Sequence, residues 1–243
     1  MRQYGLIGRR LSHSFSKRYF TDKFRNEGID ACYSLYELDD IEEIKSLIIN
    51  NNTLRGLNVT IPYKQSVIPY LDNLSKEAQA TGAVNCIAIA DGKLTGYNTD
   101  IRGIEASLDH LDITSSYRAI VLGTGGAAKA VRYVLHNRGI EHIVVSRDAS
   151  RGDYTYATLP PELIASHHLI INTTPAGMYP NIDTMPAIDL TAIGTKHLLF
   201  DLVYNPSPTL LMRQMEERGA TVLGGGLMLE VQAEASWKIW NER

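Results

Sequence analysis

The sequence is poor in cysteine, has no long apolar run and carries no excess of positive charge. Its 243 residues include only Cys32 and Cys86, which match no metal-ligand spacing and fit a reduced compartment better than a disulfide framework. No stretch approaches the roughly 20 apolar residues that span a bilayer, and the segment before Gly8 is too short for a signal-peptide core. We therefore expect an unexported, cytoplasmic protein.

The charge balance also excludes several partners. Lysine and arginine total 24 against 27 acidic residues, a net charge of −3, so no overall basic field attracts nucleic acid or an anionic membrane. The hydrophobic share of 44% and the charged share of 21% exclude a disordered or fibrous chain. The seven histidines show no metal-ligand spacing, so no metal is expected. A small molecule is the expected partner.

Strands and helices alternate along the chain in two runs, and the second run restarts near Arg118. Short apolar strands between helices are typical of parallel sheets buried on both faces. The pattern predicts strands at 4–7, 31–38, 57–61, 84–90, 93–97, 119–122, 142–145, 169–173, 198–203 and 221–223, with helices at 15–24, 41–50, 101–108, 127–135, 210–215 and 228–240. Asp91-Gly92 predicts a tight hairpin turn. The chain is therefore expected to be an α/β protein.

A glycine-rich turn opens the second run. Gly123, Thr124, Gly125, Gly126 and Ala127 follow an apolar strand and precede a helix, where backbone N–H groups and a helix N-terminus can hold a pyrophosphate. The third glycine of the usual dinucleotide fingerprint is replaced by an alanine, which still permits close helix packing. An ordinary strand-to-helix turn is the alternative.

The end of the next strand bears on which dinucleotide would bind. Ser146, Arg147 and Arg151 suit the 2′-phosphate of NADP, because arginine pairs with phosphate. Asp148 lies between the two arginines and would suit the ribose hydroxyl of NAD. The residues favour NADP and leave NAD open, with two solvated surface arginines as the simplest alternative.

Polar side chains also gather beside the strands of the first run. Ser14 and Ser16 open a helix, where hydroxyls and backbone donors suit a carboxylate, although a helix cap is the simpler explanation. Lys64 and Asp100 each follow a strand, and each alone would be an ordinary surface charge. The other polar residues at strand ends are Asn58, Thr60, Asn85, Asn98 and Thr99. So many polar groups beside apolar strands indicate a cleft.

Together these motifs resemble the shikimate dehydrogenase family, from Tyr4 to the C-terminal helix. The segments that carry the resemblance, in matching order and spacing, are His13–Ser16, Asn58–Lys64, Gly82–Asn85, Gly96–Asp100, Gly123–Ala127, Asn172–Thr174 with Gly177 and Met178, Asp201–Tyr204, and Met228 and Leu229 with Gln232. The resemblance implies two domains. Residues 1–101 with 227–243 would form a substrate-binding catalytic domain, and 102–226 an NADP-binding, Rossmann-like doubly wound parallel sheet. The C-terminal helix would pack back on the first domain.

The family resemblance implies the reversible, NADP-dependent reduction of 3-dehydroshikimate to shikimate in chorismate and aromatic amino-acid biosynthesis. It assigns no metal and is compatible with a monomer or a homodimer. Lys64 would be the general acid and base, oriented by Asp100, and would protonate the oxygen that gains charge as hydride attacks the carbonyl. The implied substrate-binding residues are Ser14 and Ser16 for the carboxylate, Thr60, Asn85 and Gln232 for ring hydroxyls, and Tyr204 beside the nicotinamide. The implied cofactor-binding residues are Gly123, Thr124, Gly125, Gly126, Ala127, Ser146, Arg147, Arg151, Thr173, Thr174 and Met228.

Four features depart from the family pattern. Lys17 stands where proline is common, a change that affects helix capping more than chemistry. Asp148 places a negative charge in the short segment after the strand at 142–145, which in the family usually binds the cofactor phosphate. Residues 152–155 have low helix propensity, so the helix that normally follows the strand at 142–145 is expected to be missing. Leu227 replaces the glycine often found before Met228.

Three other functions compete with this interpretation. A quinate/shikimate dehydrogenase of broader specificity would share every motif. A sensor without catalytic activity could use the same fold, but the presence of both Lys64 and Asp100 argues against it. A methylenetetrahydrofolate dehydrogenase-like protein would share the two-domain plan without the serine pair and the Asn-Thr-Asp segment together.

Overall fold

The computed structural model describes residues 1–11 and 14–242, and the chain folds into two compact units. Unit 1 comprises Met1–Asp100 with Val231–Arg243, and unit 2 comprises Ile101–Glu230. His13, which belongs to one of the family motifs, lies outside the described residues. The mixed α/β class is confirmed, with one sheet in each unit.

Unit 1 is built on a mixed six-stranded sheet in the order β2-β1-β3-β5-β6-β4. Strand β1 pairs in parallel with β2 and β3, whereas β3, β5 and β6 pair antiparallel. The predicted hairpin turn between β5 and β6 is confirmed, since Asp91 and Gly92 both have positive φ. Its elements are β1 (Arg2–Gly8), α1 (Phe15–Asn26), β2 (Ala31–Glu37), a 3₁₀ turn (Ile41–Glu43), α2 (Ile44–Ile49), β3 (Leu54–Val59), a second 3₁₀ turn (Ile68–Tyr70), β4 (Asn73–Leu74), α3 (Lys76–Thr81), β5 (Cys86–Ala90), β6 (Lys93–Tyr97) and most of α8 (Gly226–Asn241).

The strand directions bring four loops to one edge of this sheet. Strands β1, β3 and β6 all end at that edge, and β5, which runs the opposite way, begins there. The segments at this edge therefore include the start of α1, the turn after β3, the residues just before β5 and the residues just after β6. Every predicted polar residue of the first run lies in one of these segments or beside it.

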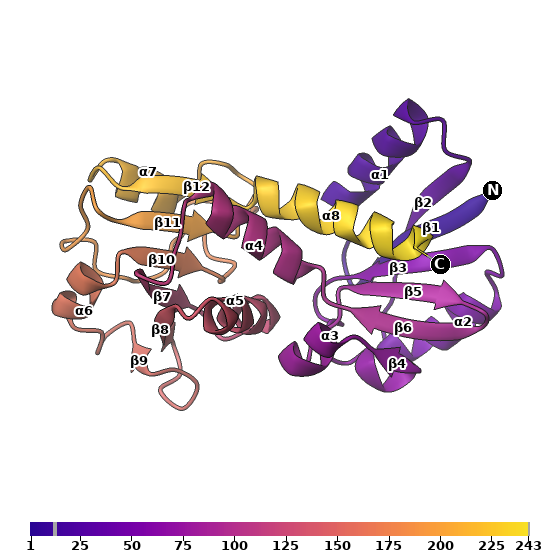
Figure 1. Cartoon of the computed structure of the whole chain (residues 1–243), viewed down its shortest axis with the longest axis horizontal. Helices are drawn as coiled ribbons and strands as arrows, with labels where there is room; N and C mark the ends of the chain where they lie inside the picture. Colours follow the sequence, from indigo (N-terminus) through magenta and orange to yellow (C-terminus); the bar gives the residue numbers. More distant parts are fainter. Residues whose placement is uncertain (12–13, 243) are drawn as a thin grey trace. The chain divides into compact units, whose positions relative to one another are not determined.

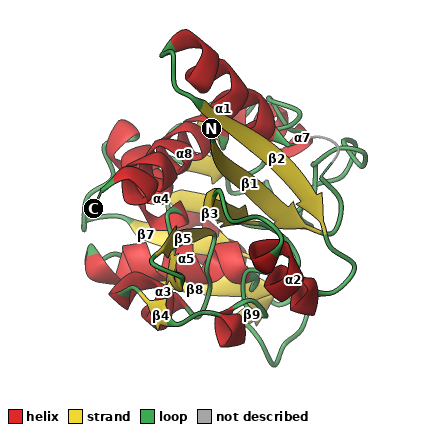
Figure 2. Ribbon diagram, turned by 90° about the vertical axis from the view of Figure 1, so that its right-hand side faces the viewer, coloured by secondary structure: helices red, strands yellow, loops and turns green. Residues whose placement is uncertain are grey.

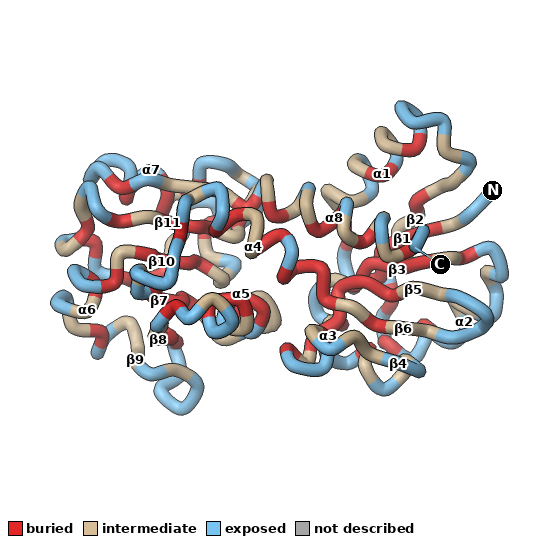
Figure 3. Tube along the Cα trace, viewed as in Figure 1, coloured by how far each residue is buried: buried red, intermediate tan, exposed pale blue. Residues whose placement is uncertain are grey.

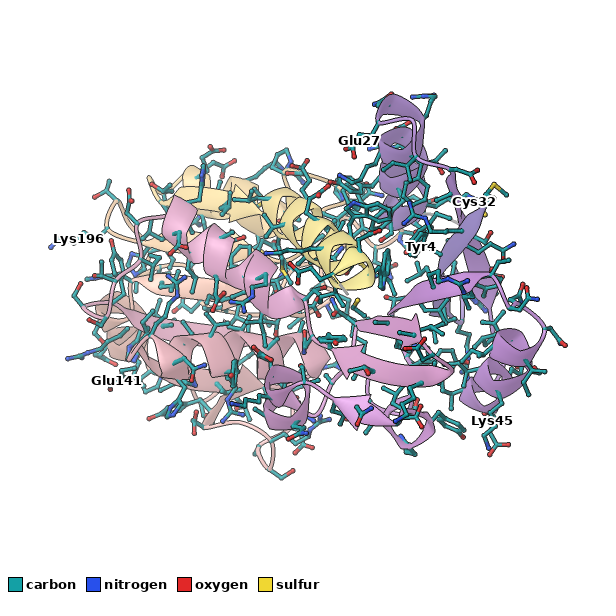
Figure 4. All side chains as sticks on the ribbon, turned by 45° about the vertical axis from the view of Figure 1, so that its right-hand side comes forward. Tyr4, Glu27, Cys32, Lys45, Glu141 and Lys196 are labelled. Atoms are coloured by element: carbon teal, nitrogen blue, oxygen red, sulfur yellow. The ribbon has the colours of Figure 1, made fainter. Side chains whose placement is uncertain are left out.

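As predicted, the C-terminal helix packs on unit 1, and aromatic side chains make the contact. Tyr4, on β1, stacks on Trp240 with ring centroids 4.9 Å apart, and α1 and α8 lie close to β1 in Figures 2 and 4. The indole N–H of Trp240 donates to the carbonyl of Ile87 at 3.0 Å. Gly56 faces this indole so closely that an added Cβ would lie 2.2 Å from its nitrogen. Trp240 therefore fastens α8 to the sheet.

Unit 2 is built on a fully parallel six-stranded sheet in the order β12-β11-β10-β7-β8-β9 (Figure 1). Strand β7 is flanked by β8 on one side and β10 on the other, which makes a topological switch point of the Rossmann type. Its elements are α4 (Asp100–His110), β7 (Arg118–Leu122), α5 (Gly126–Asn137), β8 (Glu141–Ser146), β9 (Tyr154–Thr155), α6 (Pro161–Ser166), β10 (Leu169–Asn172), β11 (Leu198–Asp201), α7 (Leu210–Glu216) and β12 (Thr221–Gly224). The predicted doubly wound sheet is confirmed.

The helix expected to be missing after β8 is absent from the described residues 147–153. Instead, a loop returns the chain directly to β9, and most of its residues are exposed, drawn pale blue in Figure 3. Asp153 closes this loop, because its N–H donates to the carbonyl of Val144 at 2.9 Å while its carboxylate accepts from the N–H of Val144 at 2.7 Å. These two hydrogen bonds hold the end of the loop against β8 without a connecting helix.

Within residues 1–11 and 14–242, no helix combines the length and the apolar character that a membrane crossing requires.

Candidate active site

The centre of the polar edge in unit 1 is an ion pair between Lys64 and Asp100. The ammonium of Lys64 donates to Asp100 Oδ2 across 2.6 Å, and the side chains are 23% and 9% exposed. Lys64 is held at its backbone, since its carbonyl accepts from the N–H of Val84 at 2.7 Å. Nothing in the sequence spacing showed that these two residues meet. They meet because the strand directions bring the turn after β3 and the end of β6 to the same edge of the sheet.

Asn85 orients the other side of the Asp100 carboxylate. The backbone N–H of Thr99 can only donate, and it lies 2.6 Å from Asn85 Oδ1. The amide group of Asn85 must therefore point its Nδ2 the other way, where it donates to Asp100 Oδ1 at 2.8 Å. Both oxygens of Asp100 accept hydrogen bonds from donors fixed by the fold.

Gln232 joins this cluster from helix α8. Its Oε1 lies 3.4 Å from Asn85 Nδ2, and the residue is only 7% exposed. Thr60 lies directly after β3, and its backbone is tied to β1 by the bond from its N–H to the carbonyl of Ile7 at 3.0 Å. Lys64, Asp100, Asn85 and Gln232 thus form one connected group of polar side chains, here called the Lys64 cluster.

The two serines lie at the start of α1, and they differ in role. Ser14 is the helix N-cap, since its hydroxyl accepts from the N–H of Lys17 at 3.2 Å, and the same hydroxyl lies at the start of α1, where a carboxylate is expected. Ser16 lies in the first turn, and its hydroxyl interacts with that of the buried Tyr33. Burial raises the pKa of Tyr33 well above its usual value, with the Ser16 contact opposing part of that rise. The Lys17 side chain donates to the backbone carbonyl of Tyr33.

The glycine-rich turn of unit 2 is open where a pyrophosphate would lie. Gly123 has φ +108°, and an added Cβ would lie 2.7 Å from the hydroxyl of Thr173, so glycine is required there. At Gly125 and Gly126 an added Cβ would meet no atom within 4 Å of the described residues. The N-cap position of the twelve-residue helix α5 that follows is Gly125, which has no side chain to cap it. These features fit a phosphate group on the helix N-terminus.

The loop after β8 lies beside this turn. Arg151 donates to the carbonyl of Thr124 at 3.5 Å, which places a guanidinium over the glycine turn. Asp148 Oδ1 accepts from both the N–H and the hydroxyl of Ser150 at 2.9 and 2.8 Å. These two bonds, with a smaller contribution from Arg151, hold the pKa of Asp148 below its usual value. Ser146 is buried, and its hydroxyl accepts from the N–H of Asp148 at 3.1 Å, whereas Arg147 is exposed.

Thr173 and Thr174 support the glycine turn from β10. The hydroxyl of Thr173 donates to the carbonyl of Leu122 at 2.6 Å, and that of Thr174 donates to Asn172 Oδ1 at 2.7 Å. Asn172 in turn donates to the buried Asp201 at 2.9 Å. Burial raises the pKa of Asp201, an effect that the donors around it partly offset. Both threonine hydroxyl protons are thus directed to protein acceptors.

Two predicted contacts of the nicotinamide lie elsewhere in unit 2. Tyr204 follows β11 and is partly buried, which raises the pKa of its hydroxyl. Met228 is 7% exposed and packs against Gly103, where an added Cβ would lie 2.5 Å from the Met228 carbonyl oxygen. Among the described residues no group of three or more histidine, cysteine or carboxylate side chains is placed to hold a metal ion.

Comparison with known proteins identifies the family. Residues 6–87 match the model of the shikimate dehydrogenase substrate-binding domain. The chain is 39% identical to the shikimate dehydrogenase (NADP(+)) of Clostridium beijerinckii, over 100% of this chain and 93% of that protein.

The chain belongs to the shikimate dehydrogenase family.

Solved structures of shikimate dehydrogenases agree with this assignment. The enzyme from Peptoclostridium difficile superposes with a TM-score of 0.86 at 35% identity, covering 99% of this chain and 91% of the other. The Thermus thermophilus enzyme, solved in complex with NADP(H) and shikimate, gives a TM-score of 0.89 at 28% identity over 99% and 94%. Both place this family member in the two-unit α/β fold described above.

Four buried polar residues lie beside the Lys64 cluster in contacts that the sequence did not indicate. Tyr33, Asn58, Thr99 and Ser236 are each at most 4% exposed and bond to one another or to the cluster. Asn58 and Thr99 stood out as polar residues at strand ends, but nothing in the sequence indicated that their side chains meet one on α8.

Proposed function

We propose that this protein is an NADP-dependent shikimate dehydrogenase that interconverts 3-dehydroshikimate and shikimate. The observation that carries the proposal is the Lys64–Asp100 ion pair of 2.6 Å, in a chain that matches shikimate dehydrogenases over its whole length. An ammonium held by a carboxylate, yet still partly exposed, is suited to deliver a proton to a small ligand.

In the proposed reaction unit 1 binds the small substrate and unit 2 the nucleotide. Ser14 and Ser16 would hold the substrate carboxylate, while Thr60, Asn85 and Gln232 would bind its ring hydroxyls. Tyr204, in unit 2, would lie beside the nicotinamide. Bound NADPH supplies the hydride. Lys64 donates a proton to the carbonyl oxygen as negative charge grows there, and in the reverse direction it removes that proton from the hydroxyl. Asp100 keeps the Lys64 ammonium in place during both directions.

The nucleotide would lie on the glycine turn with its 2′-phosphate at the loop after β8. Gly123 to Ala127 would surround the pyrophosphate, and Thr173 and Thr174 would keep that turn in position. Arg147, Arg151 and Ser146 would bind the phosphate, and the backbone at Met228 would meet the nicotinamide. The involvement of Asp148 Oδ1 with Ser150 favours NADP over NAD, because this carboxylate oxygen already accepts two hydrogen bonds within its own loop.

The proposal includes a cytoplasmic location, which suits a chain whose two cysteines are both free. It admits either a monomer or a homodimer, which light scattering coupled to size-exclusion chromatography would distinguish.

The test is the appearance of the reduced-nicotinamide absorbance when purified protein is mixed with shikimate and NADP. We expect a strong signal with that pair, a weaker one with NAD, and a weaker one when quinate replaces shikimate. Equal rates with quinate would favour the broader quinate/shikimate activity. No signal with any of these pairs would overturn the proposal.

A further inference from the structure

Asn58 lies beneath the Lys64 cluster, at the end of β3, and is only 4% exposed. Its Oδ1 accepts from the hydroxyl of Tyr33 at 2.8 Å, and its Nδ2 donates to the carbonyl of Asn85 at 3.2 Å and to the hydroxyl of Ser236 at 2.9 Å. The Asn85 carbonyl can only accept, so the orientation of the Asn58 amide is fixed. Both ends of this amide are therefore committed to protein partners.

Ser236 links this asparagine to helix α8. It is fully buried, and its hydroxyl donates to the carbonyl of Gln232, one turn earlier, at 2.9 Å. The hydroxyl oxygen also lies 3.2 Å from that of Thr99, whose backbone N–H orients Asn85. Since Gln232, Ser236 and Trp240 are spaced four residues apart, they share one face of the helix.

Two bonds thus fix the position of this helix face on the sheet. The indole of Trp240 is tied to the carbonyl of Ile87 at 3.0 Å, and Ser236 is tied to Asn58. Gln232 is the next residue along the same face, and its side chain reaches Asn85 Nδ2 at 3.4 Å. A change at Ser236 would therefore shift the position of Gln232, although Ser236 itself touches no ligand.

We propose that Asn58 is a positioning residue that acts through Ser236 and the Asn85 carbonyl to hold Gln232 and Asn85 at the distance the substrate requires. This inference rests on the proposed function, because it takes Gln232 and Asn85 to be substrate-binding residues. It assigns Asn58 no contact with substrate, since both amide protons and the amide oxygen already bond to protein groups.

Ser236→Ala tests the proposal, and Ser107→Ala is its matched control. Ser107 is also fully buried on a helix and also donates to the carbonyl four residues earlier, at 2.8 Å, but within the described residues its hydroxyl makes no second bond. Both changes remove one buried hydroxyl, but Ser236→Ala also leaves an Asn58 amide proton without its acceptor, so it should lower the free energy of unfolding more than Ser107→Ala does. Only Ser236→Ala should raise KM for shikimate, by about three- to tenfold for the loss of one neutral hydrogen bond, with little change in kcat or in KM for NADP.

A second pair of measurements separates positioning from a general loss of stability. If Ser236 acts through Gln232, then Ser236→Ala should have almost no further effect on KM in a protein that already carries Gln232→Ala. Tyr33→Phe, which removes the donor to Asn58 Oδ1 and keeps the ring packed on Phe20 at 4.7 Å, should also raise KM for shikimate without raising KM for NADP. Since the Tyr33 hydroxyl also contacts Ser16, this rise supports the proposal only if it is likewise lost beside Gln232→Ala.

The proposal is overturned if Ser236→Ala behaves like Ser107→Ala in KM, or if its effect is undiminished beside Gln232→Ala. Failure of the proposed function gives a different result, because the wild-type protein would then show no shikimate-dependent reduction of NADP. If the wild type is active and Gln232→Ala leaves KM unchanged, the assignment of Gln232 to the substrate fails, and this inference fails with it.

Discussion

Replacing Asp100 by asparagine should show whether the Lys64 cluster needs a charge or only a hydrogen-bond acceptor. In the folded protein the two oxygens of Asp100 accept from Lys64 Nζ at 2.6 Å and from Asn85 Nδ2 at 2.8 Å. Asp100→Asn keeps the shape of the side chain but offers only one acceptor oxygen. One of the two donors must therefore face an NH2 group.

The size of the effect follows from these contacts. A buried donor left without an acceptor costs about 1–3 kcal/mol, so the free energy of unfolding should fall by about that amount. The Lys64 ammonium also loses a charged partner, and a hydrogen bond to a charged group is worth about 1.5–3 kcal/mol, or about 10- to 150-fold in rate. We expect kcat to fall within that range.

A double exchange separates the two causes. In Asp100→Asn with Asn85→Asp, the new carboxylate at position 85 can accept from the N–H of Thr99 and from the new amide, whose oxygen then accepts from Lys64. Thr99 and Lys64 again have acceptors, and Gln232 must turn its amide so that its NH2 faces the new carboxylate, but the charge no longer touches Lys64. We expect stability to recover while kcat stays low.

Urea unfolding and steady-state kinetics on the wild type and the two variants make this test, with KM for NADP as the control that unit 2 is intact. The reasoning would be refuted if the double exchange restored kcat, because hydrogen-bond geometry alone would then suffice. It would also be refuted if Asp100→Asn lost neither stability nor rate.

Four further predictions concern other parts of the chain. Burial raises the pKa of Cys86 to about 12, so a thiol reagent at pH 8 should label only Cys32, which projects from β2 in Figure 4, until the protein unfolds; rapid labelling of two thiols would contradict this. Arg147→Ala should raise KM for NADP by about 10- to 100-fold and leave KM for NAD unchanged, as measured by initial rates. Gly56→Ala should lower the free energy of unfolding by about 1–3 kcal/mol in urea, because the new Cβ overlaps a buried indole. The folded-state pKa of Asp201 is raised, so the stability that this residue contributes is present below its unfolded pKa of about 3.9 and is lost as the pH rises through the folded value. Urea unfolding of the wild type and of Asp201→Asn should therefore show the stability of the wild type, relative to the variant, falling over that pH window; a rise would contradict this.

The sequence predicted the order of the main strands and helices, because apolar residues recur with the period of each element. It also predicted the missing helix after β8, since residues 152–155 are poor helix formers. It did not predict α3 (Lys76–Thr81) or α6 (Pro161–Ser166), which are too short to show a helical period. The strand expected at 84–90 begins only at Cys86, because the N–H groups of Val84 and Asn85 bond to Lys64 and Tyr97 outside the regular ladder.

The composition of the candidate site was more predictable than its connections. Lys64 and Asp100 could be selected as residues at strand ends, yet their contact depends on β3 and β6 running in the same direction. The hydrogen bonds that join Tyr33, Asn58 and Ser236 could not be predicted at all. They join residues up to 178 positions apart, and each of these would be an ordinary polar residue in its own helix or strand.

The most direct test of the account is the turnover of shikimate with NADP by the wild type and by Lys64→Ala, at saturating concentrations of both ligands. The account predicts rapid formation of reduced nucleotide by the wild type and a rate about 10²- to 10⁴-fold lower for the variant, as for the loss of a general acid and base. A folded Lys64→Ala protein that binds both ligands and keeps most of the wild-type turnover would contradict it.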